Sequence, residues 1–244
     1  MARILITGST DGLGRATAEA LLDQGHAVIV HARNPGRADA VAALVGRGAD
    51  IVIADLADRA AVLDATRELN DGAAIDAVIH NAGVLSGPSL LPVNVVAPYL
   101  FTALLTSPTR HVYLSSSMHR DGRATLDGLD WDGGSMTASY SDTKLLVAAF
   151  SAAVTERWAP RVLANSVDPG WVATKMGGAG APDDFDLGHE TQERLAVDPD
   201  LQVSGGYWHH GAQQQPASGV RDPDFRARLV RELAVVTGVA LPER

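Results

Sequence analysis

The most constraining feature of the chain is a glycine-rich turn directly after its first apolar run. Ile4-Leu5-Ile6 is followed by Gly8, Gly12 and Gly14. Gly8 permits a tight turn, Gly12 lets the backbone approach a pyrophosphate, and Gly14 lets the following helix pack closely on the strand. The N-terminus of that helix would offer free N–H groups to phosphates. The turn therefore predicts a dinucleotide-binding domain, with incidental glycines in an ordinary turn as the alternative.

Short apolar runs alternate with segments of helical length along the whole chain. Runs rich in Val and Ile and bounded by Gly, Asp or Asn are typical of buried parallel strands. The predicted strands are 4–6, 27–30, 50–54, 77–79, 111–114 and 162–167, with a short one near 206–208. The predicted helices are 13–22, 37–45, 59–69, 93–105, 141–158 and 224–236. This alternation predicts an α/β Rossmann fold, a doubly wound parallel sheet of about seven strands with helices on both faces.

The composition excludes several classes of function. The 244 residues include no cysteine and carry a formal net charge of −9, so thiol chemistry is excluded and no nucleic-acid partner is expected. No apolar stretch approaches the roughly 18 residues that suggest a membrane span, and the run 4–6 is too short for a signal-peptide core. The histidines lack partners at metal-ligand spacing, so no metal is expected. We therefore expect a soluble, cytoplasmic protein without a membrane partner.

One domain is expected over residues 1–244. Hydrophobic residues make up 46% of the chain, enough for one substantial core. The glycine-rich segment 177–182 and the acidic segment 183–186 predict a mobile loop rather than a domain linker, because too few residues follow to build a second core. Residues 177–204 are expected to form the loop region on the substrate side. The predicted helices 93–105 and 145–154 are apolar on more than one face, which leaves a homo-oligomer possible.

Arginines follow the second predicted strand. An acidic residue there would bind a free ribose 2′-hydroxyl, whereas arginine suits a 2′-phosphate. The segment contains Arg33, Asn34 and Arg37 and no acid. It therefore favours NADP(H) over NAD(H), with ordinary solvated loop charges as the alternative. Asp55, after the third strand, could hold the adenine edge or cap the next helix.

A tyrosine and a lysine lie four residues apart at the start of a long predicted helix. Tyr140 and Lys144 therefore share one helix face. An ammonium group beside a phenol favours the phenolate and is expected to lower its pKa. The pair could then move a proton to or from a substrate oxygen while a cofactor carries hydride. The fifth strand ends in Ser115-Ser116-Ser117, whose hydroxyl groups could polarise a carbonyl or merely cap backbone groups.

Five motifs in this order resemble the short-chain dehydrogenase/reductase family. They are Thr7-Gly8-x-x-x-Gly12-x-Gly14, Asn81-Ala82-Gly83, the serine strand end, Tyr140-x-x-x-Lys144 and the segment 168–174. The resemblance implies that Tyr140 is the general acid/base, that Lys144 holds the nicotinamide ribose and that Ser116 positions the substrate oxygen. Asn94 matches the family's supporting asparagine. The expected cofactor-binding residues are Gly8, Thr10, Asp11, Gly12, Leu13, Gly14, Arg33, Asn34, Arg37, Asp55, Leu56, Asn81, Ala82, Gly83, Tyr140, Lys144, Pro169, Gly170, Val172 and Thr174.

The chain also departs from the family pattern. His80 stands where the family commonly has an asparagine, and the connection from Asn81 to Asn94 is short. The segment from Ser116 to Tyr140 is long, as in the branch of retinol-dehydrogenase-like and WW-domain-oxidoreductase-like proteins, and could obstruct a dimer contact.

The resemblance implies NADPH-dependent reduction of a small-molecule carbonyl, or the reverse oxidation of an alcohol. A non-catalytic NADP(H)-binding sensor or scaffold on the same fold is the alternative.

Overall fold

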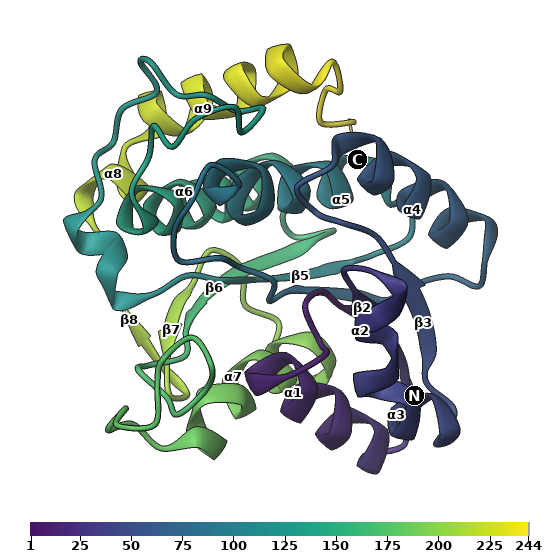
Figure 1. The fold of residues 1–244 in the computed structure, drawn as a ribbon. Coiled ribbons are helices and arrows are strands. Elements are labelled where there is room, and N and C mark those ends of the chain that lie inside the picture. The colour runs from purple at the N-terminus through teal and green to yellow at the C-terminus, as the bar shows by residue number, and fades with distance from the viewer. Residues whose placement is uncertain (244) are drawn as a thin grey trace.

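One eight-stranded sheet forms the centre of the molecule in a computed structural model, which describes residues 1–243 (Figure 1). The strand order is β3-β2-β1-β4-β5-β6-β7-β8; neighbours from β3 to β7 pair in parallel and β8 is antiparallel to β7. The strands are β1 (Arg3–Ile6), β2 (Ala27–Ala32), β3 (Asp50–Ile53), β4 (Ala77–His80), β5 (Arg110–Leu114), β6 (Leu163–Asp168), β7 (Tyr207–His209) and β8 (Ala212–Gln214). The predicted Rossmann fold is confirmed. The prediction missed β8, whose three exposed residues carry no apolar pattern.

Helices cover both faces of the sheet. One face carries α1 (Gly12–Asp23), α2 (Pro35–Ala38), η1 (Asp39–Val41), α3 (Ala42–Gly46) and α7 (Phe185–Val197), at the bottom of Figure 1. The other carries α4 (Arg59–Asp71), η2 (Pro92–Val96), α5 (Ala97–Leu104), α6 (Tyr140–Trp158), α8 (Ser218–Arg221) and α9 (Pro223–Thr237). A short turn, η3 (Ser117–Asp121), follows β5.

Successive residues of β1 enter different cores because side chains alternate across a strand. Ile4 and Ile6 pack with Leu21 of α1 on one face. Leu5 packs with the core that contains Phe150 of α6 on the other. Both faces of this strand are therefore buried, which explains its continuous apolar sequence. The strand order reverses between β1 and β4, and the carboxyl ends of the strands at such a point form a ligand crevice.

The expectation of a loop throughout 177–204 was wrong, because this region contains α7. Asp184 starts the helix by accepting hydrogen bonds from the backbone N–H groups of Asp186 and Leu187. The helix packs on α1, and Gln192 donates a buried hydrogen bond to Thr17. The buried face includes polar residues such as Thr191 and Gln192, so the segment lacks the apolar periodicity that predicts a helix.

Two predicted helices are also interrupted. The segment predicted as a helix over 37–45 forms three short pieces, α2, η1 and α3. The helix predicted over 93–105 begins with the π-helical turn η2 and continues as α5.

A second layer covers the outer faces of α5 and α6. Helix α9 packs on α6, outside it in Figure 1. Trp131, in the long segment before α6, is buried in the core next to α4 and α5. Arg59 of α4 contacts both the segment before α6 and helix α9. It pairs with Asp132 at 2.5 Å and donates to the carbonyl of Val236 at 2.7 Å. The chain's own segments therefore bury the extra apolar faces that the sequence showed.

Candidate active site

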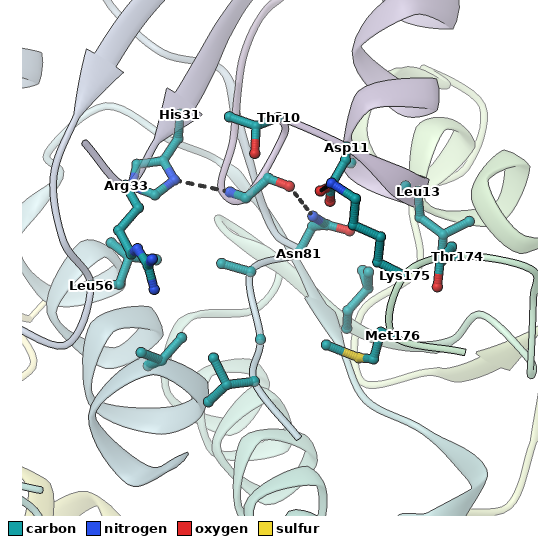
Figure 2. Close-up of a pocket in the computed structure, with 18 of the residues that line it drawn as sticks. Thr10, Asp11, Leu13, His31, Arg33, Leu56, Asn81, Thr174, Lys175 and Met176 are labelled. Carbon is teal, nitrogen blue, oxygen red and sulfur yellow. Dashed lines mark hydrogen bonds and ion pairs between the residues drawn. The ribbon is translucent and has the colours of Figure 1, made fainter. Parts of the chain in front are cut away.

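The glycine turn is held from both neighbouring strands. Gly8 has φ +67°, and a Cβ there would lie 2.8 Å from Cα of Ala82, so the position requires glycine. Asn81, after β4, donates from Nδ2 to the carbonyls of Thr7 at 2.8 Å and Gly8 at 3.1 Å. His31 of β2 accepts the N–H of Gly8 at Nδ1, at 3.0 Å (Figure 2). These bonds fix the turn before any ligand binds.

One cavity of about 540 Å³ connects this turn with the tyrosine–lysine pair. Most residues predicted to bind the cofactor line it. These are Gly8, Thr10, Asp11, Gly12, Leu13, Gly14, Arg33, Arg37, Asp55, Leu56, Asn81, Ala82, Gly83, Tyr140, Lys144, Pro169 and Thr174. The predicted residues Asn34, Asn94, Ser116, Gly170 and Val172 are not among the lining residues.

Three of the residues that do not line the cavity, Asn34, Gly170 and Val172, have roles in the local backbone structure. Asn34 caps α2 by accepting the N–H of Arg37 at 3.1 Å. Gly170 has φ +81°, and a Cβ there would lie 2.7 Å from Oδ2 of Asp183. Val172 is buried and forms an isolated parallel bridge with Asp183. Gly170 and Val172 thus shape the loop after β6.

Charged side chains gather at the glycine-turn end of the cavity. Asp11 pairs with Arg37 at 2.7 Å and with Lys175 at 2.9 Å. These cations hold the pKa of Asp11 below its usual range despite the opposing effect of burial. Arg37 also donates to the hydroxyl of Thr10 at 3.0 Å. Arg33 is exposed and lines the cavity without an ion pair to any of residues 1–243 (Figure 2).

The loop after β6 lies against the glycine turn. A Cβ on Gly12 would contact Cγ2 of Thr174 at 3.3 Å, and the Asp11–Lys175 ion pair links the same two segments. Figure 2 shows Thr174, Lys175 and Met176 on one side of the cavity. Substitution of Gly12 would therefore disturb the loop as well as the approach of a phosphate.

Tyr140 and Lys144 lie at the other end of the cavity, at the start of α6. Ser139 and Asp142 form a capping box that begins this helix. Lys144 is buried; its Nζ donates to the carbonyl of Leu114 at 2.7 Å and lies 5.3 Å from the ring centre of Tyr140.

The expected lowering of the tyrosine pKa is not found. Burial, and then the negative charge of Asp168, raise the pKa of Tyr140 to about 12. Burial lowers the pKa of Lys144 to about 8, against the opposing effect of Asp168. Desolvation of the phenol and the charge of Asp168 both favour the neutral form, so Tyr140 is a protonated hydroxyl at neutral pH.

The serines at the end of β5 have different surroundings. Ser115 is buried, lines the cavity and donates from Oγ to the carbonyl of Lys144 at 2.9 Å. Ser116 caps η3, where its Oγ accepts the N–H of Met118 at 3.3 Å. The alternation of side chains along a strand could not show which of these serines faces the cavity. The role expected for Ser116 stays a prediction.

Asn94 connects the short loop after β4 to α6. Its side chain accepts the N–H of Val84 at 2.9 Å and donates to the carbonyl of Val84 at 3.0 Å and to Thr143 Oγ1 at 3.0 Å. A Cβ on Gly83 would lie 3.4 Å from Oδ1 of Asn94 and 3.6 Å from Nζ of Lys144. Asn94 and Lys144 therefore both lie close to Gly83, despite the short connection that precedes Asn94.

Several lining residues were not assigned from the sequence. They are His31, Ala57, Val84, Ser89, Val93, Leu114, Ser115, Lys175 and Met176. Lys175 and Met176 directly follow the last family motif, and their position in the chain next to it is a signal that could have identified them. Within residues 1–243 there is no cluster of side chains suited to hold a metal ion, and no helix long and apolar enough to cross a membrane.

The sequence of this chain is similar to those of known dehydrogenases. A family model described as short chain dehydrogenase matches residues 2–102. Short-chain dehydrogenase chyC of Penicillium rubens is 36% identical over 99% of this chain and 100% of its own length. The chain belongs to the short-chain dehydrogenase family. Human retinol dehydrogenase 13 is 26% identical over 98% of this chain and 85% of its own length, which supports the retinol-dehydrogenase-like branch.

A solved relative supports the fold. A structure described as a short chain dehydrogenase from Escherichia coli CFT073, complexed with NADPH, has a TM-score of 0.71 at 22% identity; the match covers 86% of this chain and 97% of that one. As a short-chain dehydrogenase, the protein is an oxidoreductase of alcohol and carbonyl groups and uses a nicotinamide cofactor. The alternative of a non-catalytic sensor or scaffold is not favoured.

Proposed function

We propose that this short-chain dehydrogenase reduces a neutral, apolar carbonyl compound, or oxidises the corresponding alcohol, with NADP(H). The observation that carries the proposal is the single cavity that has Arg33 and the glycine turn at one end and Tyr140 with Lys144 at the other. A bound nicotinamide dinucleotide would supply or accept the hydride. The glycines without Cβ and the start of α1 suit its phosphates.

The protein's own part in reduction is proton delivery. Tyr140, with a pKa of about 12, keeps its proton at neutral pH and can donate it to the oxygen of the carbonyl as the C–O bond order falls. The phenolate that remains is stabilised by the Lys144 ammonium, 5.3 Å from the ring centre. Ser116 is proposed to hold the substrate oxygen. Water would return the proton to Tyr140.

The preference for NADP(H) rests on Arg33. The 2′-phosphate is the only feature that separates the two cofactors, and a bidentate guanidinium recognises it well. Arg37 is already paired with Asp11, so Arg33 is the freer donor. The NADPH complex of the E. coli relative supports the same preference.

Exposed apolar side chains at the carboxyl end of the sheet support an apolar substrate. All three internal methionines are exposed, with 47% of Met118, 60% of Met136 and 43% of Met176 accessible. Met176 lines the cavity, Met118 follows the serine strand end, and Met136 accepts the N–H of Gly87 at 3.4 Å. Methionine usually fills cores, and flexible thioethers at a surface suit variable apolar ligands. The human relative is named for an alcohol, retinol.

A panel of carbonyl compounds with NADPH tests this function. We expect the highest kcat/KM for uncharged aromatic and aliphatic ketones or aldehydes, and lower values for charged 2-oxo acids. Tyr140→Phe should lower kcat by about a thousandfold or more and leave the Kd for NADPH unchanged. A fully active Tyr140→Phe variant would contradict the mechanism. Faster turnover of 2-oxo acids would contradict the substrate class alone.

A further inference from the structure

The carbonyl oxygen of Ser116 lies where three hydrogen bonds converge. The backbone N–H of His119 reaches it at 3.0 Å, as the turn η3 requires. Nδ1 of His119 lies 2.7 Å from it, and the hydroxyl of Tyr207 donates to it at 2.9 Å. The last two bonds are not part of any regular backbone pattern. They come from side chains buried to 0% and 3% exposure, one on η3 and one on β7.

The hydrogen bond at Nε2 of His119 determines which tautomer of the ring is present. The backbone N–H of Ala217 donates to Nε2 at 3.0 Å, so Nε2 is the acceptor and Nδ1 carries the proton. Nδ1 therefore donates to the carbonyl of Ser116 at 2.7 Å, which is nearer than the hydroxyl of Tyr207 at 3.0 Å. Burial also lowers the pKa of His119, which keeps the ring neutral.

The rings of His119 and Tyr207 support each other. Their centres are 4.4 Å apart with 29° between the planes. Their positions are also fixed from the C-terminal part of the chain, because β7 pairs with β6 through Ser166 and Tyr207, and Ala217 follows β8. Residues 207–217 thus reach across β6 to the end of β5.

Ser116 needs such support because the sheet does not hold it. The register of β5 with β6 ends at Leu114 and Val167, and the N–H of Ser115 makes the last bond to β6. The backbone of Ser116 is extended, at φ −170° and ψ 154°, and the chain turns into η3 directly afterwards. Without the two side-chain bonds the serine would depend on its contacts in η3, such as the long bond of 3.3 Å that its Oγ accepts from Met118. Misplacement of the hydroxyl by about 1 Å is costly in catalysis.

We propose that His119 and Tyr207 are positioning residues, which act through the backbone of Ser116 to set its hydroxyl for the substrate oxygen. The inference rests on the proposed role of Ser116 in carbonyl reduction. It assigns a function in the reaction to the C-terminal segment 207–217, beyond the motifs from which the family was inferred. The two donors hold one carbonyl from two elements, so loss of either should loosen the same serine.

Tyr207→Phe tests this inference with little change in packing, since only the hydroxyl is lost. We expect kcat for carbonyl reduction to fall about tenfold, equivalent to about 1.4 kcal/mol, with the Kd for NADPH unchanged. Tyr99→Phe is the matched control. Tyr99 is also fully buried, and its hydroxyl also donates to a backbone carbonyl, that of Val239 at 2.6 Å. Both variants should lower Tm, but Tyr99→Phe should keep kcat.

A double-mutant cycle with Ser116→Ala separates positioning from general destabilisation. If Tyr207 acts through Ser116, Tyr207→Phe has no further effect on kcat when Ser116→Ala is present. Multiplicative losses, or an equal loss of kcat in Tyr99→Phe, would overturn the inference and leave the proposed function intact. Full activity of Ser116→Ala would instead refute the proposed role of Ser116, and the inference with it.

His119 provides a second variant, at the side chain whose Nδ1 lies 3.0 Å from the Tyr207 hydroxyl. Asparagine at position 119 places an amide nitrogen near the position of Nδ1, whereas leucine has no donor. We expect His119→Asn to retain several times the kcat of His119→Leu at equal NADPH affinity. Equal kcat values for these two variants would contradict donation from Nδ1 as the positioning contact.

Discussion

At the scale of single residues, the arginines at the end of β2 differ in their pairing. Arg37 is neutralised by Asp11, which also binds Lys175, whereas Arg33 lines the cavity and makes no ion pair with residues 1–243. The sequence grouped the two arginines together. The structure separates them, because Asp11 lies in the glycine turn, more than twenty residues away in the chain.

Replacing Arg33 should therefore change cofactor choice. In Arg33→Ala we expect the Kd for NADPH to rise about ten- to a hundredfold, with that for NADH nearly unchanged, because a charge-assisted bond to phosphate is worth about 1.5–3 kcal/mol. Arg37→Ala should have a smaller effect. Fluorescence titration of both cofactors measures this. Arg47→Ala, which breaks an exposed pair with Asp23, is the control. Equal losses of NADH and NADPH affinity would contradict 2′-phosphate recognition.

If Lys144 has the role proposed above, the reaction should depend on pH. Its pKa is lowered to about 8, so the ammonium is complete below that pH and is lost above it. We expect kcat for carbonyl reduction to be level below about pH 7 and to fall as the pH rises through 8. Stopped-flow assays with saturating NADPH and substrate check this. Arginine stays charged over the range, so the residual activity of Lys144→Arg should not fall; an unchanged pH profile in that variant would exclude Lys144 as the source.

At the scale of elements, the ends of the parallel strands carry buried neutral histidines. His31 on β2 accepts the N–H of Gly8, and His80 on β4 contacts His111 of β5 at 3.2 Å. Burial lowers the pKa of His31 and, well below the usual value, that of His80. Burial also lowers the pKa of His119 in η3. These imidazoles accept protons more readily in the unfolded chain than in the folded one.

Stability should therefore fall in mild acid. Their contribution is complete above the unfolded pKa near 6.5 and is lost as the pH falls below it toward each folded pKa. Each such histidine adds a slope of up to about 1.4 kcal/mol per pH unit to the free energy of unfolding. Urea titrations between pH 7.5 and 5 measure the slope. His80→Asn should reduce the slope by up to the contribution of one titrating histidine, about 1.4 kcal/mol per pH unit. A flat profile for the wild type would contradict buried neutral histidines.

At the scale of the whole molecule, the chain covers its own apolar helices. Trp131 packs over α4 and α5, α9 packs on α6, and Arg59 links the two covering segments. The indole nitrogen of Trp158 on α6 also donates to the carbonyl of Pro242, 3.0 Å away. A partner subunit would have to displace these segments to reach α5 and α6.

We therefore expect a monomer at micromolar concentrations. A second copy would have to replace buried apolar contacts already made within the chain, at about 25 cal/mol for each Å² uncovered. Sedimentation velocity across a hundredfold range of concentration tests this. The companion variant Trp131→Ala should lower Tm by several degrees, because a large buried side chain is lost. A stable dimer of the wild type would contradict the covering role of these segments.

Much of the fold and of the lining of the candidate cofactor cavity was predictable because the signals are local. The glycine spacing from Gly8 to Gly14, the alternation of apolar runs with helical segments, and the four-residue spacing of Tyr140 and Lys144 each depend on neighbours in the chain. They determine the Rossmann fold and the cavity that joins the turn to the tyrosine.

Only the tertiary structure decided which contacts those residues make. It placed Ser115 on the cavity wall, raised the pKa of Tyr140 by burial, formed α7 on a partly polar buried face and brought Tyr207 to the carbonyl of Ser116, 91 positions away in the chain. The physical reason is that desolvation and hydrogen bonding depend on what surrounds a group in space. A local pattern specifies the element that carries a residue, whereas its charge state and partners are set by distant segments packed against it.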